Sequence, residues 1–327
     1  IVHSNGGILL KHLVEMGLHS NAQKKSRVFY FTTCGWMMWN WLVSGLLLKS
    51  TIYLYDGSPF YPNSEMLWDF ADSEKINFMG VSAKYIDALS KENINVIGKY
   101  KLKNLETIGS TGSPLIHESF DYIYTNVKKD VLVASLSGGT DIVGCFIGGN
   151  PLSVVRRGEI QGPILGMDVH VYDENANSLK NEKGELVCIK SFHSMPLFFW
   201  NDKNNEKYHD AYFNKYENVW CHGDYILKTE NNGFIIFGRS DATLNPGGVR
   251  IGTAEIYRQV EQIEEVMEGL VVGQIWKGDT RVVLFVRLNE NSNLTEELMD
   301  QIKTKIKTGA SPRHVPAKII SVKDIPI

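Results

Sequence analysis

The sequence GRSDATLNPGGVRIGTAEI, Gly238–Ile256, holds the densest pattern in the chain. Two arginines, Arg239 and Arg250, flank a glycine pair, Gly247 and Gly248. A guanidinium group can bind a phosphate through two parallel hydrogen bonds, and glycines let the backbone approach a ligand without a Cβ in the way. The segment therefore suits a polyanion such as a nucleotide phosphate or coenzyme A. A plain surface loop between two solvated arginines is the alternative that the segment alone leaves open.

The last residues of the same segment are expected to begin a helix. We expect Thr253 as the N-cap and Glu255 in the first turn, where the helix dipole favours a carboxylate. Apolar residues follow at helical spacing, at Ile256, Val260 and Ile263. A polar, glycine-bearing loop that leads into a helix predicts a junction between two domains at this point.

Length and composition indicate a globular protein of more than one domain. The chain has 327 residues, more than a typical single domain. A net charge of −3 gives no reason to expect nucleic acid or an anionic membrane as a partner. The longest apolar run, Trp36–Leu48, is too short to span a bilayer. The four cysteines are scattered without a C-x-x-C pair, which argues against structural zinc and disulfides and predicts a cytosolic protein.

From Arg27 to Ser137 strand-like and helix-like segments alternate. The expected strands are Arg27–Phe31, Thr51–Tyr55, Asn77–Val81, Leu105–Ser110 and Val131–Ser137. The expected helices are Trp36–Leu48, Asn63–Lys75, Ser82–Lys91 and Leu115–Asn126. Continuous apolar strands separated by amphipathic helices predict βαβ units and a buried parallel sheet.

Two polar, glycine-bearing loops follow strands of this sheet. They are GSTGSP, Gly109–Pro114, and SGGTD, Ser137–Asp141. Because ligands of such sheets sit beyond the carboxyl ends of the strands, we expect the two loops to border a ligand crevice. Each loop alone could be an ordinary strand-to-helix turn.

The pattern changes after Pro151, where short strands and turn signals predict a small β subdomain. Asp168–Tyr172 and Glu185–Lys190 are its expected antiparallel pair, and Lys203–Glu217 is expected to be a surface loop with a short helix. The predicted fold class is therefore α/β, and the expected parts are a large domain with a parallel βαβ sheet over 1–238, including the β subdomain over about 151–238, then a hinge at 239–241 and a smaller α+β domain over 242–327.

The strings GR-x-D, G-x-R-I-G and TAEI together resemble the hinge and the first C-terminal loop of the adenylate-forming enzymes, which include acyl-CoA synthetases, luciferases and adenylation domains. The resemblance covers essentially the whole chain and is closest to the acetyl-CoA synthetase branch. Four segments narrow it to ligases that act on acetoacetate: TTCGWMMWNWLVSGL (Thr32–Leu46), GSTGSPL (Gly109–Leu115), SGGTDI (Ser137–Ile142) and SPRHVPAKI (Ser311–Ile319). It implies an acid–thiol ligase that uses ATP, Mg²⁺ and coenzyme A and that works through an acyl-adenylate.

The resemblance gives roles to residues of both loops. Gly112, Ser113 and Pro114 would border the adenine base. Thr140 would donate its hydroxyl to the α-phosphate, as a catalytic residue. Asp141 would take the place of a glutamate associated with Mg²⁺, although its side chain is one methylene shorter.

The second half of the chain supplies further expected contacts. Asp224, in WCHGDY, would accept hydrogen bonds from the ribose hydroxyls, although the family has Thr-Gly-Asp where this chain has His-Gly-Asp. Arg239 would lie near the same sugar, and the small domain would rotate about Asp241. Arg250 would be a catalytic residue that contacts phosphate or coenzyme A. Gly247 and Gly248 would leave room for the pantetheine arm.

A third set of residues concerns the acid. Acetyl-CoA synthetases carry a tryptophan where this chain has Gly138, so the resemblance predicts an acid larger than acetate. Trp36, Met37 and Trp39 are the candidate walls of that pocket. Ordinary core packing on a helix is the alternative for these three side chains.

Two elements that the resemblance implies are not in the printed sequence. A phosphate loop should precede Ile1, and a catalytic lysine should follow Ile327. We therefore expect an internal fragment that lacks the N-terminal half of its protein and cannot form the adenylate alone. Another acyl-CoA or aryl-acid ligase and a catalytically inactive nucleotide-binding homologue remain open. A Rossmann oxidoreductase is disfavoured because no strand is followed by G-x-G-x-x-G.

Overall fold

The structure is a computed structural model that describes residues 1–240, 244, 251–276, 279–290 and 292–325. Contacts divide the chain into two compact units. The first unit consists of Ile1–His222 and Lys228–Ile235, and the second unit of Gly223–Leu227 and Ile236–Ile327. The domain and hinge boundaries expected at 238 and 242 stay a prediction. In the part of the chain described here, every helix is too short or too polar to cross a membrane.

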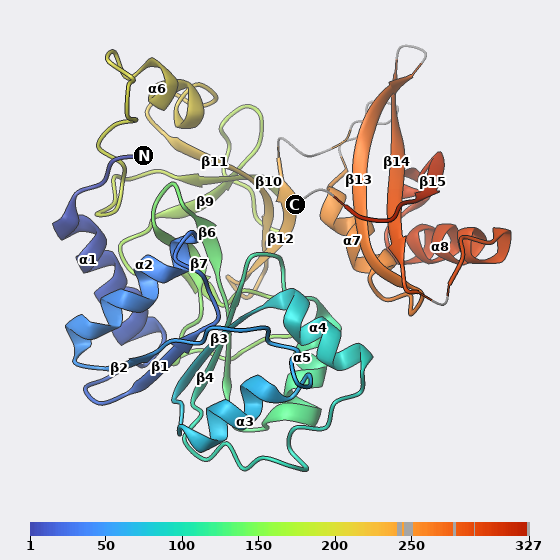
Figure 1. The fold of residues 1–327 in the computed structure, drawn as a ribbon. Coiled ribbons are helices and arrows are strands. Elements are labelled where there is room, and N and C mark those ends of the chain that lie inside the picture. The colour runs from blue at the N-terminus through green and yellow to red at the C-terminus, as the bar shows by residue number, and fades with distance from the viewer. Residues whose placement is uncertain (241–243, 245–250, 277–278, 291, 326–327) are drawn as a thin grey trace. The chain divides into compact units, whose positions relative to one another are not determined.

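A five-stranded parallel sheet forms the centre of the first unit, in the order β2-β1-β3-β4-β5. Figure 1 labels β1 to β4 of this sheet. Its strands are β1 (Arg27–Tyr30), β2 (Thr51–Tyr53), β3 (Phe78–Ser82), β4 (Thr107–Thr111) and β5 (Leu132–Ser135). The helices between them are α2 (Met37–Ser44), α3 (Met66–Ser73), α4 (Ala83–Lys91) and α5 (His117–Tyr122). The predicted βαβ alternation and parallel sheet are confirmed, with element ends shifted by a few residues.

Helices cover both faces of this sheet. Alternate strand residues point to opposite sides, and both sides carry apolar side chains that must be buried. Phe29 lies in the cluster that contains residues of α3, α4 and α5, such as Trp68 and Ile86, both fully buried. Val28 lies in the opposite cluster with Trp41 of α2. Burial of side chains of this size contributes roughly 1.5–3 kcal/mol each.

The chain leaves the parallel sheet directly after β5, which sequence reasoning did not foresee. Ser137, expected in the same strand, instead starts β6 (Ser137–Gly139), which pairs antiparallel with β7 (Gly144–Gly148); β8 (Gly162–Pro163) completes this small sheet. The physical cause is the pair of glycines at 138 and 139, which permits a close approach of the two backbones.

The predicted antiparallel β region is confirmed. It contains β9 (Val169–Tyr172), β10 (Lys183–Cys188), β11 (Trp220–Lys228) and β12 (Phe234–Arg239), in the order β12-β11-β10-β9. The short helix expected in Lys203–Glu217 is α6 (Glu206–Tyr212). Its last residue, Tyr212, is only 5% exposed, so this segment is not merely a surface loop.

The second unit contains an α+β arrangement, as predicted. The three-stranded sheet has the order β13-β14-β15, formed by Val266–Trp276, Asp279–Leu288 and Lys318–Ser321, and the helices are α7 (Thr253–Val260) and α8 (Glu296–Gly309). The N-cap of α7 was predicted wrongly. Gly252 occupies it and Thr253 is the first helical residue. The Glu255 carboxylate accepts the Gly252 N–H at 3.1 Å, the contact that the third helical residue makes in a capping box, and so stabilises this helix start.

Candidate active site

The two polar loops of the first unit lie next to one another. β4 and β5 are neighbouring parallel strands, so both loops leave the same edge of the sheet. The Thr111 hydroxyl donates to the Leu136 carbonyl at 2.9 Å, and the Leu136 N–H donates to the Ser110 carbonyl at 2.8 Å. These two hydrogen bonds tie the start of one loop to the start of the other.

Gly112 turns the first loop away from β4. Its φ is +93°, a conformation that L residues with a side chain rarely adopt. No heavy atom lies within 4 Å of a Cβ built there, so the backbone conformation, not space, requires the glycine. Ser113 and Pro114 follow it and are half-buried.

The second loop ends in a strained turn. Thr140 is exposed and Asp141 is half-buried, so a hydroxyl and a carboxylate are presented side by side in the chain. Val143, two residues later, has φ +45° although it is β-branched and only 8% exposed. Such a conformation persists only when its surroundings hold it in place.

Two histidines hold the backbone of this turn. Nε2 of His3 donates to the Asp141 carbonyl at 2.7 Å, and Nε2 of His12 donates to the Val143 carbonyl at 2.6 Å. A carbonyl only accepts, so each Nε2 carries the proton. Burial lowers the pKa of His12, which keeps its ring neutral.

A side-chain hydrogen bond also reaches Asp141. The Tyr212 hydroxyl donates to Asp141 Oδ1. Tyr212 comes from α6, far along the chain, and its ring stacks on Trp220 with 3.7 Å between centroids. Neither Tyr212 nor Trp220 was singled out from the sequence, because nothing in the local sequence marks a helix tyrosine as the partner of a distant carboxylate.

A buried ion pair supports the neighbouring strand β7. In α1 (Asn5–Leu13) and the π-helical turn that follows it, Lys11 Nζ lies 3.3 Å from Glu15 Oε1. Lys11 donates to the Cys145 carbonyl at 2.7 Å, and the Cys145 N–H donates to Glu15 at 2.7 Å. Trp41 Nε1 donates to the other Glu15 oxygen at 2.9 Å, so the same carboxylate also holds α2. Sequence reasoning missed this pair, although an i, i+4 Lys–Glu pair beside apolar residues was a usable signal.

Gly138 has a packing role in β6. A Cβ built there would lie 1.9 Å from the Gly144 carbonyl oxygen and 2.5 Å from Cys145 Cα. The missing side chain therefore faces the backbone of β7 and does not itself leave a free volume. The expectation that Gly138 enlarges an acid pocket gains no support from this geometry and stays untested.

The three candidate wall residues lie at the start of α2. Trp36 precedes the helix and is 63% exposed, while Met37 and Trp39 are half-buried. The core positions of this helix are instead Met38 and Trp41. Trp36 and Trp39 are therefore outside the core cluster, whereas Met37 packs against it.

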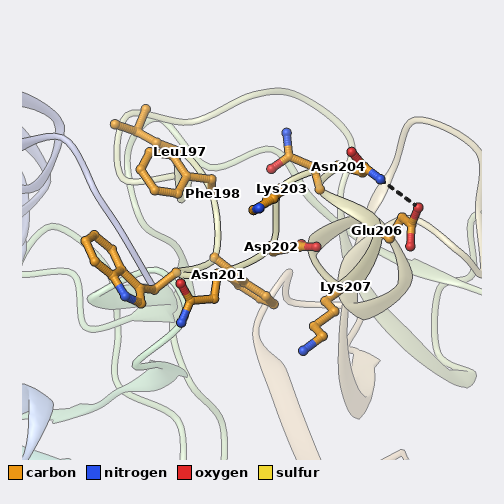
Figure 2. A pocket seen from close by; sticks show the side chains of 11 residues that line it. Leu197, Phe198, Asn201, Asp202, Lys203, Asn204, Glu206 and Lys207 are labelled. Carbon is orange, nitrogen blue, oxygen red and sulfur yellow. Dashed lines mark hydrogen bonds between the residues drawn. The ribbon is translucent and has the colours of Figure 1, made fainter.

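An open pocket of ≈ 920 Å³ lies on the segment that leads into α6 (Figure 2). Its lining runs from Leu197 to Lys207 and includes Trp200, which is 75% exposed. None of the residues selected from the sequence lines it. Helix α6 connects this pocket to the Thr140–Asp141 turn, because its last residue, Tyr212, donates a hydrogen bond to Asp141.

The second unit holds the expected Asp224–Arg239 pair. Asp224 is 7% exposed, and its Oδ1 lies 3.4 Å from Nη1 of Arg239. Gly223 has φ +80°, and a Cβ built there would lie 2.7 Å from Arg239 Nη2, so a larger residue would displace the guanidinium. The Ser240 N–H donates to the Gly223 carbonyl at 2.7 Å, which fixes the chain next to Arg239.

Four of the selected residues cannot be placed. Asp241, Gly247, Gly248 and Arg250 lie outside the described residues. Within the described part of the chain, no group of three or more His, Cys, Asp or Glu side chains could hold a metal ion.

Comparisons with curated proteins give matches that run along the whole of this chain, whereas no family model matches it. It is 57% identical over 326 residues to the acetoacetyl-coenzyme A synthetase of Rhizobium meliloti (strain 1021). It is 45% identical over 328 residues to the acetoacetyl-CoA synthetase of Xenopus tropicalis. All of this chain is covered in both cases, with 50% and 49% of the relatives, so the chain spans about half their length.

Solved structures show the same fold. The acetoacetyl-CoA synthetase from Streptomyces lividans matches with a TM-score of 0.93 and 42% identity, over 99% of this chain and 50% of that chain. The anthranilate CoA ligase AuaEII, solved with anthranoyl-AMP, matches with a TM-score of 0.81 at 18% identity, over 99% of this chain and 61% of that chain. The predicted fold, a part of the adenylate-forming ligase fold, is confirmed.

Proposed function

Because the chain is a homologue of the acetoacetyl-CoA synthetases, we propose that it forms about half of a ligase that joins acetoacetate to coenzyme A. The similarity along the whole of this chain carries this proposal. In the first half-reaction, the acetoacetate carboxylate attacks the α-phosphate of ATP, so that an acyl-adenylate forms and pyrophosphate leaves. In the second, the coenzyme A thiol attacks the acyl carbon, and AMP leaves as acetoacetyl-CoA forms.

The Thr140–Asp141 turn is our candidate for the α-phosphate contact. Thr140 is exposed and would donate its hydroxyl to a phosphate oxygen on which negative charge develops. The histidine contacts of His3 and His12 support this role, because a donor positioned in advance needs no rearrangement during the reaction.

The residues present fit a Mg²⁺ ion whose ligands are mostly phosphate oxygens and water molecules. Asp141 offers one carboxylate oxygen, Oδ2, that no described donor occupies. Mg²⁺ in nucleotide sites commonly takes one or two carboxylates together with phosphate oxygens and water. Asp141 would supply such a ligand, and the ion would neutralise charge on the phosphates.

The nucleotide contacts are proposed within each unit. In the first unit, the loop Gly112–Pro114 would border the adenine base, since the positive φ of Gly112 turns the backbone at the strand end. In the second unit, Asp224 would accept hydrogen bonds from the ribose hydroxyls, with Arg239 holding its carboxylate.

The remaining assignments rest on the sequence alone. Trp36, Met37, Trp39 and Gly138 would border the acid. Arg250 would contact phosphate or coenzyme A, Gly247 and Gly248 would admit the pantetheine arm, and the small domain would rotate about Asp241. We also propose that the protein works in the cytosol, in keeping with its four unpaired cysteines, and that the printed sequence alone is inactive.

The test is ATP–pyrophosphate exchange by the full-length gene product with acetoacetate, acetate, butyrate and 3-hydroxybutyrate in turn. We expect the fastest exchange with acetoacetate. Faster exchange with another acid would overturn the substrate but keep the ligase. Absence of exchange with every acid would overturn the ligase. The printed 327-residue chain, assayed in parallel, should show no exchange.

A further inference from the structure

We propose that Tyr212 is a positioning residue that fixes the Asp141 carboxylate for the metal ion bound with the nucleotide. The inference rests on the proposed function, because it assigns a partner to a residue of that site. It concerns only the first unit.

Asp141 is held at one oxygen and open at the other. The Tyr212 hydroxyl donates to Oδ1, while His3 fixes the backbone carbonyl of the same residue at 2.7 Å. Among the residues that the structure describes, no donor or cation reaches Oδ2. A phenol orients the carboxylate without cancelling its charge, whereas a lysine or arginine in the same place would compete with a metal ion.

Packing against three aromatic side chains holds the Tyr212 ring in place. It is 5% exposed and stacks on Trp220, with an interplanar angle of 13°. Phe199 and Tyr208 contact it edge-on, at 5.7 Å and 5.5 Å between centroids. Trp220 itself is 1% exposed, so the stack is anchored in the core.

Gly139 leaves room for the second carboxylate oxygen of Asp141. A Cβ built at Gly139 would lie 2.9 Å from Asp141 Oδ2, closer than real side chains come. The glycine therefore leaves the space that the carboxylate needs when Tyr212 holds its other oxygen.

The experiment measures how much Mg²⁺ strengthens binding of a nonhydrolysable ATP analogue to the full-length protein, by calorimetric titration with and without the ion. The ratio of the two dissociation constants is the metal-dependent gain. Removal of a group that orients a metal ligand commonly costs about tenfold or more in metal affinity. Tyr212→Phe keeps the stack and removes only the hydroxyl, so we expect its gain to fall about tenfold.

Tyr216→Phe is the matched control, because Tyr216 is equally buried and its hydroxyl donates to the Asp173 carbonyl at 2.8 Å. It should keep the gain of the unmodified protein. If Tyr212 acts through Asp141, then Tyr212→Phe added to Asp141→Asn should cause no further loss.

The outcomes separate the two proposals. A Tyr212→Phe variant that keeps the full gain, while Asp141→Asn loses it, overturns the role of Tyr212. A further loss in the double variant also overturns it, since the hydroxyl would then act by another route. An unmodified protein that binds no nucleotide overturns the proposed function itself. Thermal unfolding midpoints of both tyrosine variants check that the fold is intact.

Discussion

Lys11 and Glu15 form an ion pair from which water is almost excluded: Nζ and Oε1 are 3.3 Å apart, and the two side chains are 3% and 4% exposed. Each also forms a hydrogen bond with the backbone of Cys145, so the pair holds β7 a few residues after the Thr140–Asp141 turn. Removing one partner of a buried, hydrogen-bonded ion pair is strongly destabilising, because the remaining charge stays buried without a counter-charge.

Glu15→Gln and Lys11→Met should each lower the free energy of unfolding by about 3–5 kcal/mol, because each leaves one buried charge alone. The double variant should lose less than the sum of the two single losses. Chemical denaturation of the three variants measures this. The control is Lys91→Met, which removes a helix pair with Asp87 that is far more exposed and should cost about 0.5 kcal/mol or less. Additive losses would show that the pair is not coupled.

Gly138→Ala should destabilise the first unit by roughly 1–3 kcal/mol or more, because its Cβ would overlap the Gly144 carbonyl oxygen. Gly138→Trp should prevent folding. Gly6→Ala is the matched control: nothing lies within 4 Å of its Cβ, and alanine favours the helix there. Thermal unfolding compares the three. A folded Gly138→Trp variant that prefers acetate would instead support the acid-pocket interpretation of Gly138.

Asp224→Asn should weaken ATP binding by about tenfold or more if its carboxylate accepts hydrogen bonds from the ribose, since bonds to charged groups contribute roughly 1.5–3 kcal/mol. Calorimetric titration of the full-length protein with ATP and with 2′,3′-dideoxy-ATP isolates this contribution. The unmodified protein should prefer ATP, and the variant should lose that preference. A variant that discriminates the two nucleotides as before would show that Asp224 does not contact the sugar.

Stability should fall as the pH falls below about 6.5, because His19 is buried in a neutral form. Its Nδ1 donates to the Gly149 carbonyl at 2.7 Å, and its Nε2 accepts the Leu165 N–H at 3.0 Å. Burial lowers the pKa of His19 from its ordinary value of 6.5. The unfolded chain therefore binds the proton first, so the stabilisation is complete above pH 6.5 and is lost as the pH falls towards the folded pKa.

Denaturation at a series of pH values tests this. His19→Gln keeps one donor and one acceptor but cannot take up a proton, so its stability should depend less on pH between about 7 and 5. Equal slopes for His19→Gln and the unmodified protein would assign the pH dependence to other groups, among them His12, whose pKa burial also lowers.

Element types and their order were predictable because their signals are local. Alternation of apolar strands with amphipathic helices predicted the parallel sheet, and polar, glycine-bearing loops after two of its strands predicted that both loops leave the same edge. The N-cap of α7 and the end of β5 were misjudged. In both places a backbone hydrogen bond or a close approach at Gly252 and Gly138 decided the boundary, and neither can be seen in residue types.

The sequence by itself determined the fold class and selected Thr140, Asp141, Asp224 and Arg239 as residues to examine. Tertiary structure alone decided what holds them. The partners of Asp141 are His3, 138 positions away, and Tyr212, 71 positions away. Periodicity and capping act over a few residues, whereas these contacts exist only after distant elements have packed. Burial then makes each hydrogen bond obligatory, because a polar group removed from water must find its partner within the fold.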